Sequence, residues 1–135
     1  MQMVVTEQNL DRISAEMGFK LAENFESKDD ARKLENLVTK ALGVLIEDGL
    51  FAYIIWLKSR SENEKKYCKK IIEVSSNLLK DERVALASKD SDSKDLQDIV
   101  LEISKDIQKT LLARQLLERM LVYARYRAKA LQKGD

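Results

Sequence analysis

The chain has 135 residues, which is enough for one hydrophobic core and too few for two. It contains no proline, four glycines and one cysteine, so helix is favoured throughout and an internal disulfide is excluded. Its formal net charge is +1 and it has no histidine, so it lacks both the commonest general base near neutral pH and the commonest nitrogen ligand of metals.

Three helices are predicted in the first half of the chain. Apolar residues recur every three or four positions over about 6–25, which is typical of an amphipathic helix. Ser27 and the acids after it have the order of a helix N-cap, so a second helix should begin at the next residue. Gly49 is placed to end that helix, because glycine adopts the left-handed conformation without cost. A third helix is expected over about 50–60. It is apolar nearly all round and should be covered on most sides.

In the second half of the chain, the sequence signals for the ends of helices are weaker. Ser61 to Glu64 has the order of a capping box and opens a fourth helix that lasts to about Lys80. Residues 81–95 are rich in Ser, Asp and Lys, which predicts a short helical turn followed by a mobile loop. From there apolar residues keep a seven-residue repeat, so we expect one long helix or two nearly collinear ones, with a boundary near Thr110 left open. The whole chain, 1–135, is predicted to be a single-domain, all-α bundle of about five to six helices with a long C-terminal helix.

Charge is segregated along this nearly neutral chain. Residues 58–80 hold seven basic and three acidic residues, and residues 114–135 hold six and two. On both predicted helices the cations lie opposite the apolar side, which a polyanion-binding surface requires and which an ordinary solvated face also provides. Acidic partners at helical spacing look scarce, since Glu73 alone interrupts the first face and Glu118 lies off the second. Arginine dominates the second face, with Tyr126 among the arginines as a platform for base stacking.

The stretch from Leu45 to Ser59 is the most distinctive part of the chain. It joins an apolar helix, an acid pair, Gly49 and an aliphatic and aromatic run that ends in Leu57-Lys58-Ser59. This pattern resembles the signature of the small α-helical subunit of the type III-B (Cmr) CRISPR RNA-guided effector complex. The resemblance covers residues 34–60 best and 111–130 more loosely, where Tyr123 stands at the place of the usual Trp. The small subunit of type III-A complexes is the related alternative.

The resemblance implies a non-catalytic subunit for antiviral defence that packs in several copies along the effector filament, against its other subunits, and helps bind guide RNA and target RNA. It implies no cofactor, metal, membrane or small-molecule substrate. The alternative is a helical protein–protein adaptor without nucleic-acid binding, with Leu50, Phe51 and Tyr53 as a partly exposed docking patch. A carboxylate-based enzyme is disfavoured, because no spacing brings acids together. The expected polyanion contacts are Lys65, Lys66, Lys69, Lys70, Arg114, Arg125, Arg127 and Lys129, with Lys58 and Arg60 as weaker candidates.

The expected compartment follows from the same residues. A lone cysteine, Cys68, suits a reducing environment, and it is expected to sit in the core as a small apolar thiol. The apolar run Met1–Val5 is too short for the core of a signal peptide. We therefore expect a cytoplasmic protein.

Overall fold

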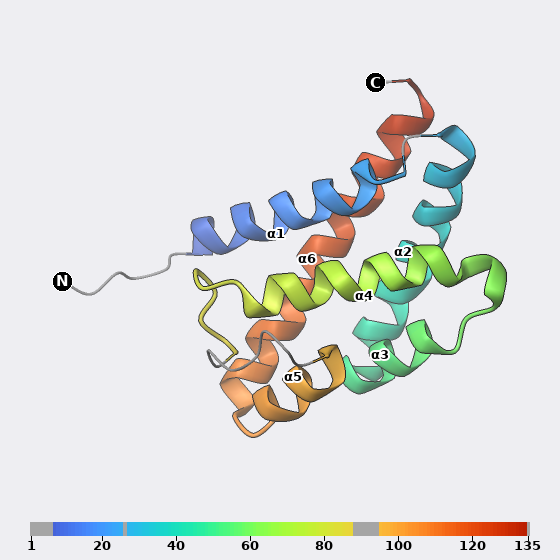
Figure 1. Ribbon diagram of the computed structural model, residues 1–135. Coiled ribbons are helices and arrows are strands. Elements are labelled where there is room, and N and C mark those ends of the chain that lie inside the picture. Colours follow the sequence, from blue (N-terminus) through green and yellow to red (C-terminus); the bar gives the residue numbers. More distant parts are fainter. Residues whose placement is uncertain (1–6, 26, 88–94, 135) are drawn as a thin grey trace.

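The protein is an all-α bundle with a long C-terminal helix, as predicted (Figure 1). The structure is a computed structural model, and it describes residues 7–25, 27–87 and 95–134. Those ranges contain six α-helices, one short 3-10 helix and no strand. The elements are α1 (Glu7–Glu23), α2 (Lys28–Asp48), α3 (Leu50–Lys58), η1 (Glu62–Glu64), α4 (Lys65–Lys80), α5 (Leu96–Ile103) and α6 (Ile107–Gln132).

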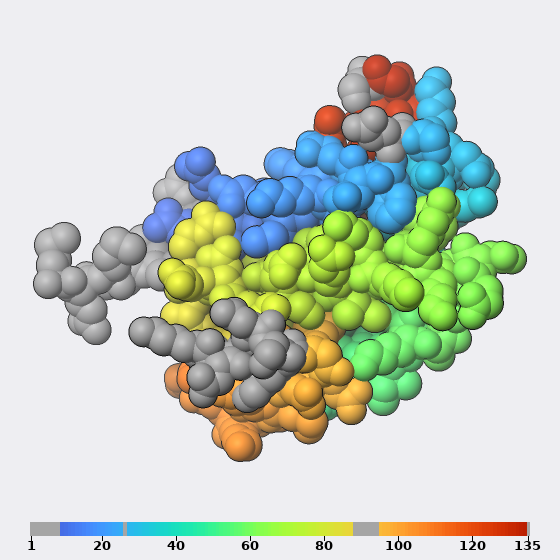
Figure 2. Space-filling view, viewed as in Figure 1, coloured from blue at the N-terminus to red at the C-terminus, as the bar shows by residue number. Residues whose placement is uncertain are grey.

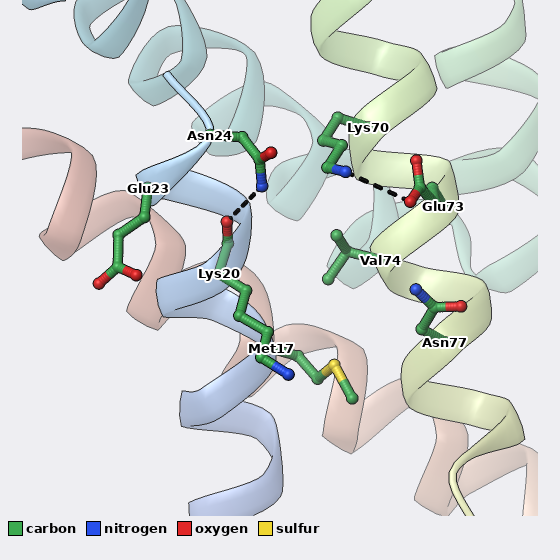
Figure 3. A pocket seen from close by; sticks show the side chains of 8 residues that line it. All are labelled: Met17, Lys20, Glu23, Asn24, Lys70, Glu73, Val74 and Asn77. Carbon is green, nitrogen blue, oxygen red and sulfur yellow. Dashed lines mark hydrogen bonds and ion pairs between the residues drawn. The ribbon is translucent and has the colours of Figure 1, made fainter. Parts of the chain in front are cut away.

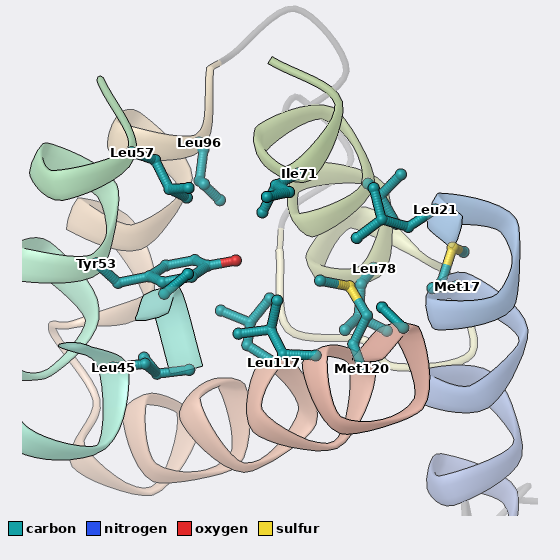
Figure 4. Packing of buried hydrophobic residues seen from close by; sticks show 14 of the residues in the cluster. Met17, Leu21, Leu45, Tyr53, Leu57, Ile71, Leu78, Leu96, Leu117 and Met120 are labelled. Atoms are coloured by element: carbon teal, nitrogen blue, oxygen red, sulfur yellow. The ribbon is translucent and has the colours of Figure 1, made fainter. Parts of the chain in front are cut away.

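α6 organises the bundle. It packs along α1 on one flank and along α2 on the other, while α4 crosses in front of it (Figure 1). Figure 4 shows Ile71 and Leu78 of α4 pointing toward Leu117 and Met120 of α6, and all four side chains are fully buried. Because α4 and α6 turn their apolar sides toward each other, their exposed sides face away from each other.

The predicted ends of α2 are confirmed. The Ser27 hydroxyl accepts a hydrogen bond from the Asp30 amide at 3.1 Å, which satisfies one of the free donors of the first turn. Gly49 has φ of 95° and ends the helix, with its amide bonded to the Leu45 carbonyl at 3.1 Å. The start of α4 differs in detail from a capping box. The Ser61 hydroxyl donates to the Glu64 carboxylate at 3.2 Å, and the 3-10 turn η1 precedes the α-helix.

Gly18 lets α1 approach α6 closely. A Cβ at this position would lie 2.5 Å from the Met120 carbonyl oxygen and 2.9 Å from the Tyr123 Cβ. Nearby, the buried Ser14 hydroxyl donates to the Leu116 carbonyl across the same contact, at 3.2 Å. The two helices therefore pack backbone against backbone, which only a residue without a side chain permits here.

The prediction of continuous or nearly collinear helix from Asp95 to the C-terminus is wrong. α5 ends at Ile103 and α6 begins at Ile107, and the chain turns sharply between them (Figure 1). The Asp106 carboxylate caps α6 by accepting from the amides of Gln108 at 2.9 Å and Lys109 at 3.1 Å. The boundary thus falls before Thr110, and the aspartate that marks it is a sequence signal that the seven-residue repeat obscured.

After α4, a short turn is tied to α1. Val84 and Leu86 are buried, and the Arg83 guanidinium lies 2.9 Å from the Asp81 carboxylate and 3.1 Å from that of Glu16. The hydrogen bonds from Arg83 hold the pKa values of both carboxyl groups below their usual range. Residues 88–94, the rest of the predicted mobile loop, lie outside the described residues, so the mobility of 81–95 stays a prediction.

α3 is covered on one side only, which corrects the expectation that it is enclosed on most sides. Leu50 and Tyr53 are buried, so they do not form the exposed docking patch that the adaptor alternative assigned to them. Phe51 is 41% exposed and Ile55 is 65% exposed. A helix that is apolar all round thus keeps one side in contact with water.

Two polar groups lie within the core beside α3. The Tyr53 hydroxyl is 2.8 Å from the Ser75 hydroxyl of α4, and both side chains are fully buried. Burial raises the pKa of Tyr53 above its ordinary value. Cys68 is buried as expected, and desolvation raises the pKa of its thiol to about 11.

Candidate nucleic-acid interface

The predicted cations fall into separate groups on the surface. Four lie on the exposed side of α4, which crosses the face seen in Figure 2, and three lie near the C-terminal end of α6. Arg114 stands alone, about 16 Å from Arg125 at the rise of an α-helix. α4 and α6 turn their apolar sides toward each other, and their cations lie on separate helices as separate groups.

Three of the four α4 lysines are partnered by carboxylates. Lys65 lies 3.6 Å from Glu62 and Lys70 lies 3.2 Å from Glu73, both within the same stretch of chain. Lys69 is exposed, and it forms no ion pair within the described residues. Glu73 therefore neutralises part of this face, as its position in the sequence indicated.

Lys66 is paired with an acid from another helix. Its ammonium lies 3.2 Å from the Asp30 carboxylate at the start of α2 and 5.1 Å from the centre of the Tyr67 ring. The Tyr67 hydroxyl donates a short hydrogen bond to the same carboxylate. That bond, followed by the one from Lys66, lowers the pKa of Asp30, while burial and the neighbouring anion raise the pKa of Tyr67 to about 12. Asp30 is thus held as an anion beside Lys66.

Two of the three α6 arginines predicted as polyanion contacts also have acidic partners, and Arg119 is ion-paired with Asp11 of α1. Arg114 donates to the Glu118 carboxylate at 3.1 Å and to the Ile46 carbonyl of α2. Arg127 lies 3.5 Å from Glu23 of α1. The prediction that these faces lack acidic partners is wrong: Glu118 is a partner at helical spacing, and Glu23 comes from a neighbouring helix. Arg127 serves a contact inside the chain.

Arg125, Tyr126 and Lys129 form a different arrangement, which we call the α6 cluster. The Arg125 guanidinium lies 5.2 Å from the centre of the Tyr126 ring, within the range of a cation–π contact. Tyr126 is 59% exposed, and Lys129 follows Arg125 by one helical turn. Neither cation forms an ion pair in the part of the chain that the structure describes. In this predicted group, an arginine, a lysine and an exposed aromatic ring lie together, and neither cation is occupied by an acidic partner among the described residues.

The weaker candidates lie at the end of α3. The Lys58 ammonium is 3.3 Å from the Gln97 side-chain oxygen and 3.9 Å from the Asp95 carboxylate, so it joins α3 to the start of α5. The Arg60 guanidinium stacks 4.3 Å above the Trp56 ring. The two side chains therefore belong to different contacts.

A groove of about 520 Å³ runs between α1 and α4 (Figure 3). Lys20 and Glu23 line it from α1, and Lys70 and Glu73 line it from α4. Figure 3 shows the Lys70 ammonium directed at Glu73, and Glu23 turned away from α4, on the side where it meets Arg127. The charges in the groove balance, so it is not an anion pocket by itself.

A second groove of about 610 Å³ lies between the N-terminal part of α2, as far as Lys40, and the segment where η1 joins α4. Lys33, Lys40 and Lys66 line it together with Asp29 and Asp30. With Glu64, three acids and three lysines line it, and Lys33 and Lys66 are ion-paired with Asp29 and Asp30. It extends the polar surface around Lys66 toward α2.

Within the described ranges, no three acidic or cysteine side chains come together as a metal site would require. None of the described helices combines the length and the apolar content that crossing a bilayer demands. The chain matches no family model, no curated protein and no solved structure.

Sequence reasoning found the cations and missed most of their partners. Asp30 and Lys66 are 36 positions apart, and Glu23 and Arg127 are 104 apart, so no local pattern links them. Glu62, Glu73 and Glu118 differ from these, because each lies three or four residues from the cation that it pairs with, and helical spacing alone links them.

Proposed function

We propose that this protein is a non-catalytic, RNA-binding subunit of a larger assembly, of the kind that its resemblance to the small subunit of type III-B CRISPR effectors implies. The observation that carries the proposal is the α6 cluster. Arg125 and Lys129 offer phosphate contacts without acidic partners in the described chain, and Tyr126 offers a ring on which a base can stack. Guide RNA and target RNA are the proposed ligands, and other subunits and further copies of the chain are the proposed protein partners.

The ion-paired lysines are secondary contacts in this proposal. Lys66 and Lys70 bind Asp30 and Glu73 near the surface, where such pairs are typically worth about 0–1 kcal/mol. A phosphate chain can replace these carboxylates at small cost. Binding should therefore combine several weak contacts and should weaken steeply with salt. Sequence recognition in such an assembly would be left to base pairing, and the protein would read the backbone.

The test is a fluorescence-anisotropy titration of a single-stranded RNA oligonucleotide against salt concentration. Replacing Arg125 and Lys129 together by Glu should weaken binding and reduce the slope of log affinity against log salt by about 1.4, since each phosphate contact contributes about 0.7 for single strands. Reversing Lys66 and Lys70 should have a smaller effect, because a phosphate must first displace Asp30 and Glu73.

The matched control reverses Lys105 and Lys109, which are exposed near the start of α6 and form no ion pair among the described residues. This variant changes the net charge equally, so it should lower affinity less and leave the slope close to that of the wild type. Equal losses in the two double variants would mean that only net charge matters. Undiminished binding after reversal of Arg125 and Lys129 would refute the proposed site.

A helical protein–protein adaptor remains the second candidate, favoured by exposed apolar residues at the start of α6. Ile107 is 76% exposed and Leu111 is 60% exposed, one turn apart on one side of the helix. Arg114, the next residue on that side, bonds to the Ile46 carbonyl, so the exposed Ile46 adjoins this surface. Affinity purification with and without nuclease distinguishes the candidates, because an adaptor keeps its protein partners after RNA is removed.

A further inference from the structure

The uncovered side of α3 carries large apolar side chains that the bundle does not use. Phe51 and Ile55 are exposed one turn apart, and the half-buried Trp56 and Ala52 form the adjoining row of the helix. Figure 1 shows α3 at the edge of the bundle, remote from α1. An apolar surface of this kind on a small protein is a typical site of association.

The two ends of α3 carry opposite charges. Glu47 and Asp48, just before the helix, are exposed and form no ion pair within the described residues. Just after it, Arg60 is stacked on Trp56, and its buried Nε has no hydrogen-bond partner. No described carboxylate lies within ion-pair distance of Arg60. The surface is therefore acidic at one end, apolar in the middle and basic at the other end.

Such an order of charges is complementary to itself when two copies lie antiparallel. We propose that two copies of this chain associate through the exposed side of α3. The two helices would lie antiparallel about a two-fold axis that is level with the midpoint between residues 53 and 54. In this register Phe51 meets Trp56 of the second copy, and Ala52 meets Ile55. Glu47 then meets Arg60, so both ends of the contact are neutralised at once, as a two-fold interface requires.

The side chains suit this register for independent reasons. Tryptophan and arginine are among the residues that contribute most to protein interfaces, and here Trp56 lies on α3 while Arg60 follows the end of that helix by two residues. Ala52 is small enough to let the two helices approach opposite Ile55. A single short helix nevertheless buries less than the roughly 800 Å² per partner of a standard interface. We therefore expect a weak dimer that forms with rising concentration and needs no RNA.

The first experiment measures association by sedimentation equilibrium over a protein concentration of about 10 µM to about 1 mM, the range expected for a weak dimer. The wild type should shift from monomer toward dimer across this series. Ile55→Glu should stay monomeric, because each copy would bring a charge into the apolar centre. Ile107→Glu is the matched control: Ile107 is still more exposed but lies on α6, so this variant should associate like the wild type.

The second experiment tests the antiparallel register. Glu47→Arg alone and Arg60→Glu alone should each reduce association, because each places like charges opposite each other at both ends. An equal mixture of the two variants should restore it, since every contact between different variants then joins an acid to a base. Far-UV circular dichroism checks that each variant keeps its helical content.

The outcomes separate the parts of the proposal. A wild type that remains monomeric at the highest concentration would overturn it. Association that survives Ile55→Glu, or that Ile107→Glu abolishes equally, would exclude α3 as the interface. A mixture that associates no better than either charge variant alone would exclude the antiparallel arrangement.

Discussion

Gly18 offers the sharpest test of the packing between α1 and α6. In the variant Gly18→Ala the added methyl group would lie 2.5 Å from the Met120 carbonyl oxygen and 3.0 Å from the Ala124 amide nitrogen. These are backbone atoms of a helix, so they cannot rotate away as the end of a flexible side chain would. The two helices must move apart, and overpacking of this kind costs about 1–3 kcal/mol. Alanine regains about 1 kcal/mol of helix propensity, so the net loss of stability should be up to about 2 kcal/mol.

Gly43 provides the matched control. It lies inside α2, and a Cβ there would meet no atom within 4 Å. Gly43→Ala should therefore gain the helix propensity alone and stabilise the protein by about 1 kcal/mol. The same substitution is thus expected to lower the free energy of unfolding in α1 and to raise it in α2.

Urea unfolding followed by far-UV circular dichroism measures both variants. The unfolding midpoint should fall for Gly18→Ala and rise for Gly43→Ala, with unchanged slopes, and the melting temperature should move by about 3–5 °C per kcal/mol. If Gly18→Ala were as stable as the wild type, or more stable, α1 would not lie against the backbone of α6 as described.

Three further predictions concern buried and paired groups. Cys68, with a pKa near 11 and little exposure, should react with an alkylating reagent at neutral pH far more slowly in the folded than in the unfolded protein, and equal rates would contradict its burial. The pKa of Asp30 is lowered by Tyr67, so its contribution to stability is present above about pH 4 and is lost as the pH falls through the folded value. Asp30→Asn should therefore flatten the acid side of a stability–pH curve, and an unaltered curve would exclude this linkage. Tyr53→Phe leaves the buried Ser75 hydroxyl without its partner and should destabilise the protein by about 1–3 kcal/mol in urea, whereas an unchanged midpoint would show that the pair adds nothing.

The fold was predictable where a local signal decides it. Ser27 and Gly49 fix the ends of α2 through a cap and a left-handed glycine, both of which act over a few residues. The break at Asp106 was not predicted because the apolar repeat continues across it. A repeat of apolar positions describes which residues are buried and does not show where the backbone turns. The one-sided cover of α3 depends on how many neighbours reach it, which composition does not determine.

The candidate site was predictable in composition and less so in geometry. The sequence identified Arg125, Tyr126 and Lys129 as neighbours on one helix, because their spacing is local. It did not reveal that α4 and α6 face each other through the core. Nor did it reveal the carboxylates that reach Lys66 and Arg127 from other helices. Such contacts arise only when distant segments meet.

The position of α6 has a consequence for biosynthesis. It is the last described helix to leave the ribosome, yet both α1 and α2 pack along it. Translation proceeds at about 5–20 residues per second, so the apolar sides of the two early helices wait for seconds before their partner emerges. Contacts so distant in sequence also slow folding. The nascent chain should therefore be most vulnerable to aggregation, and most dependent on chaperones, in the interval before α6 appears.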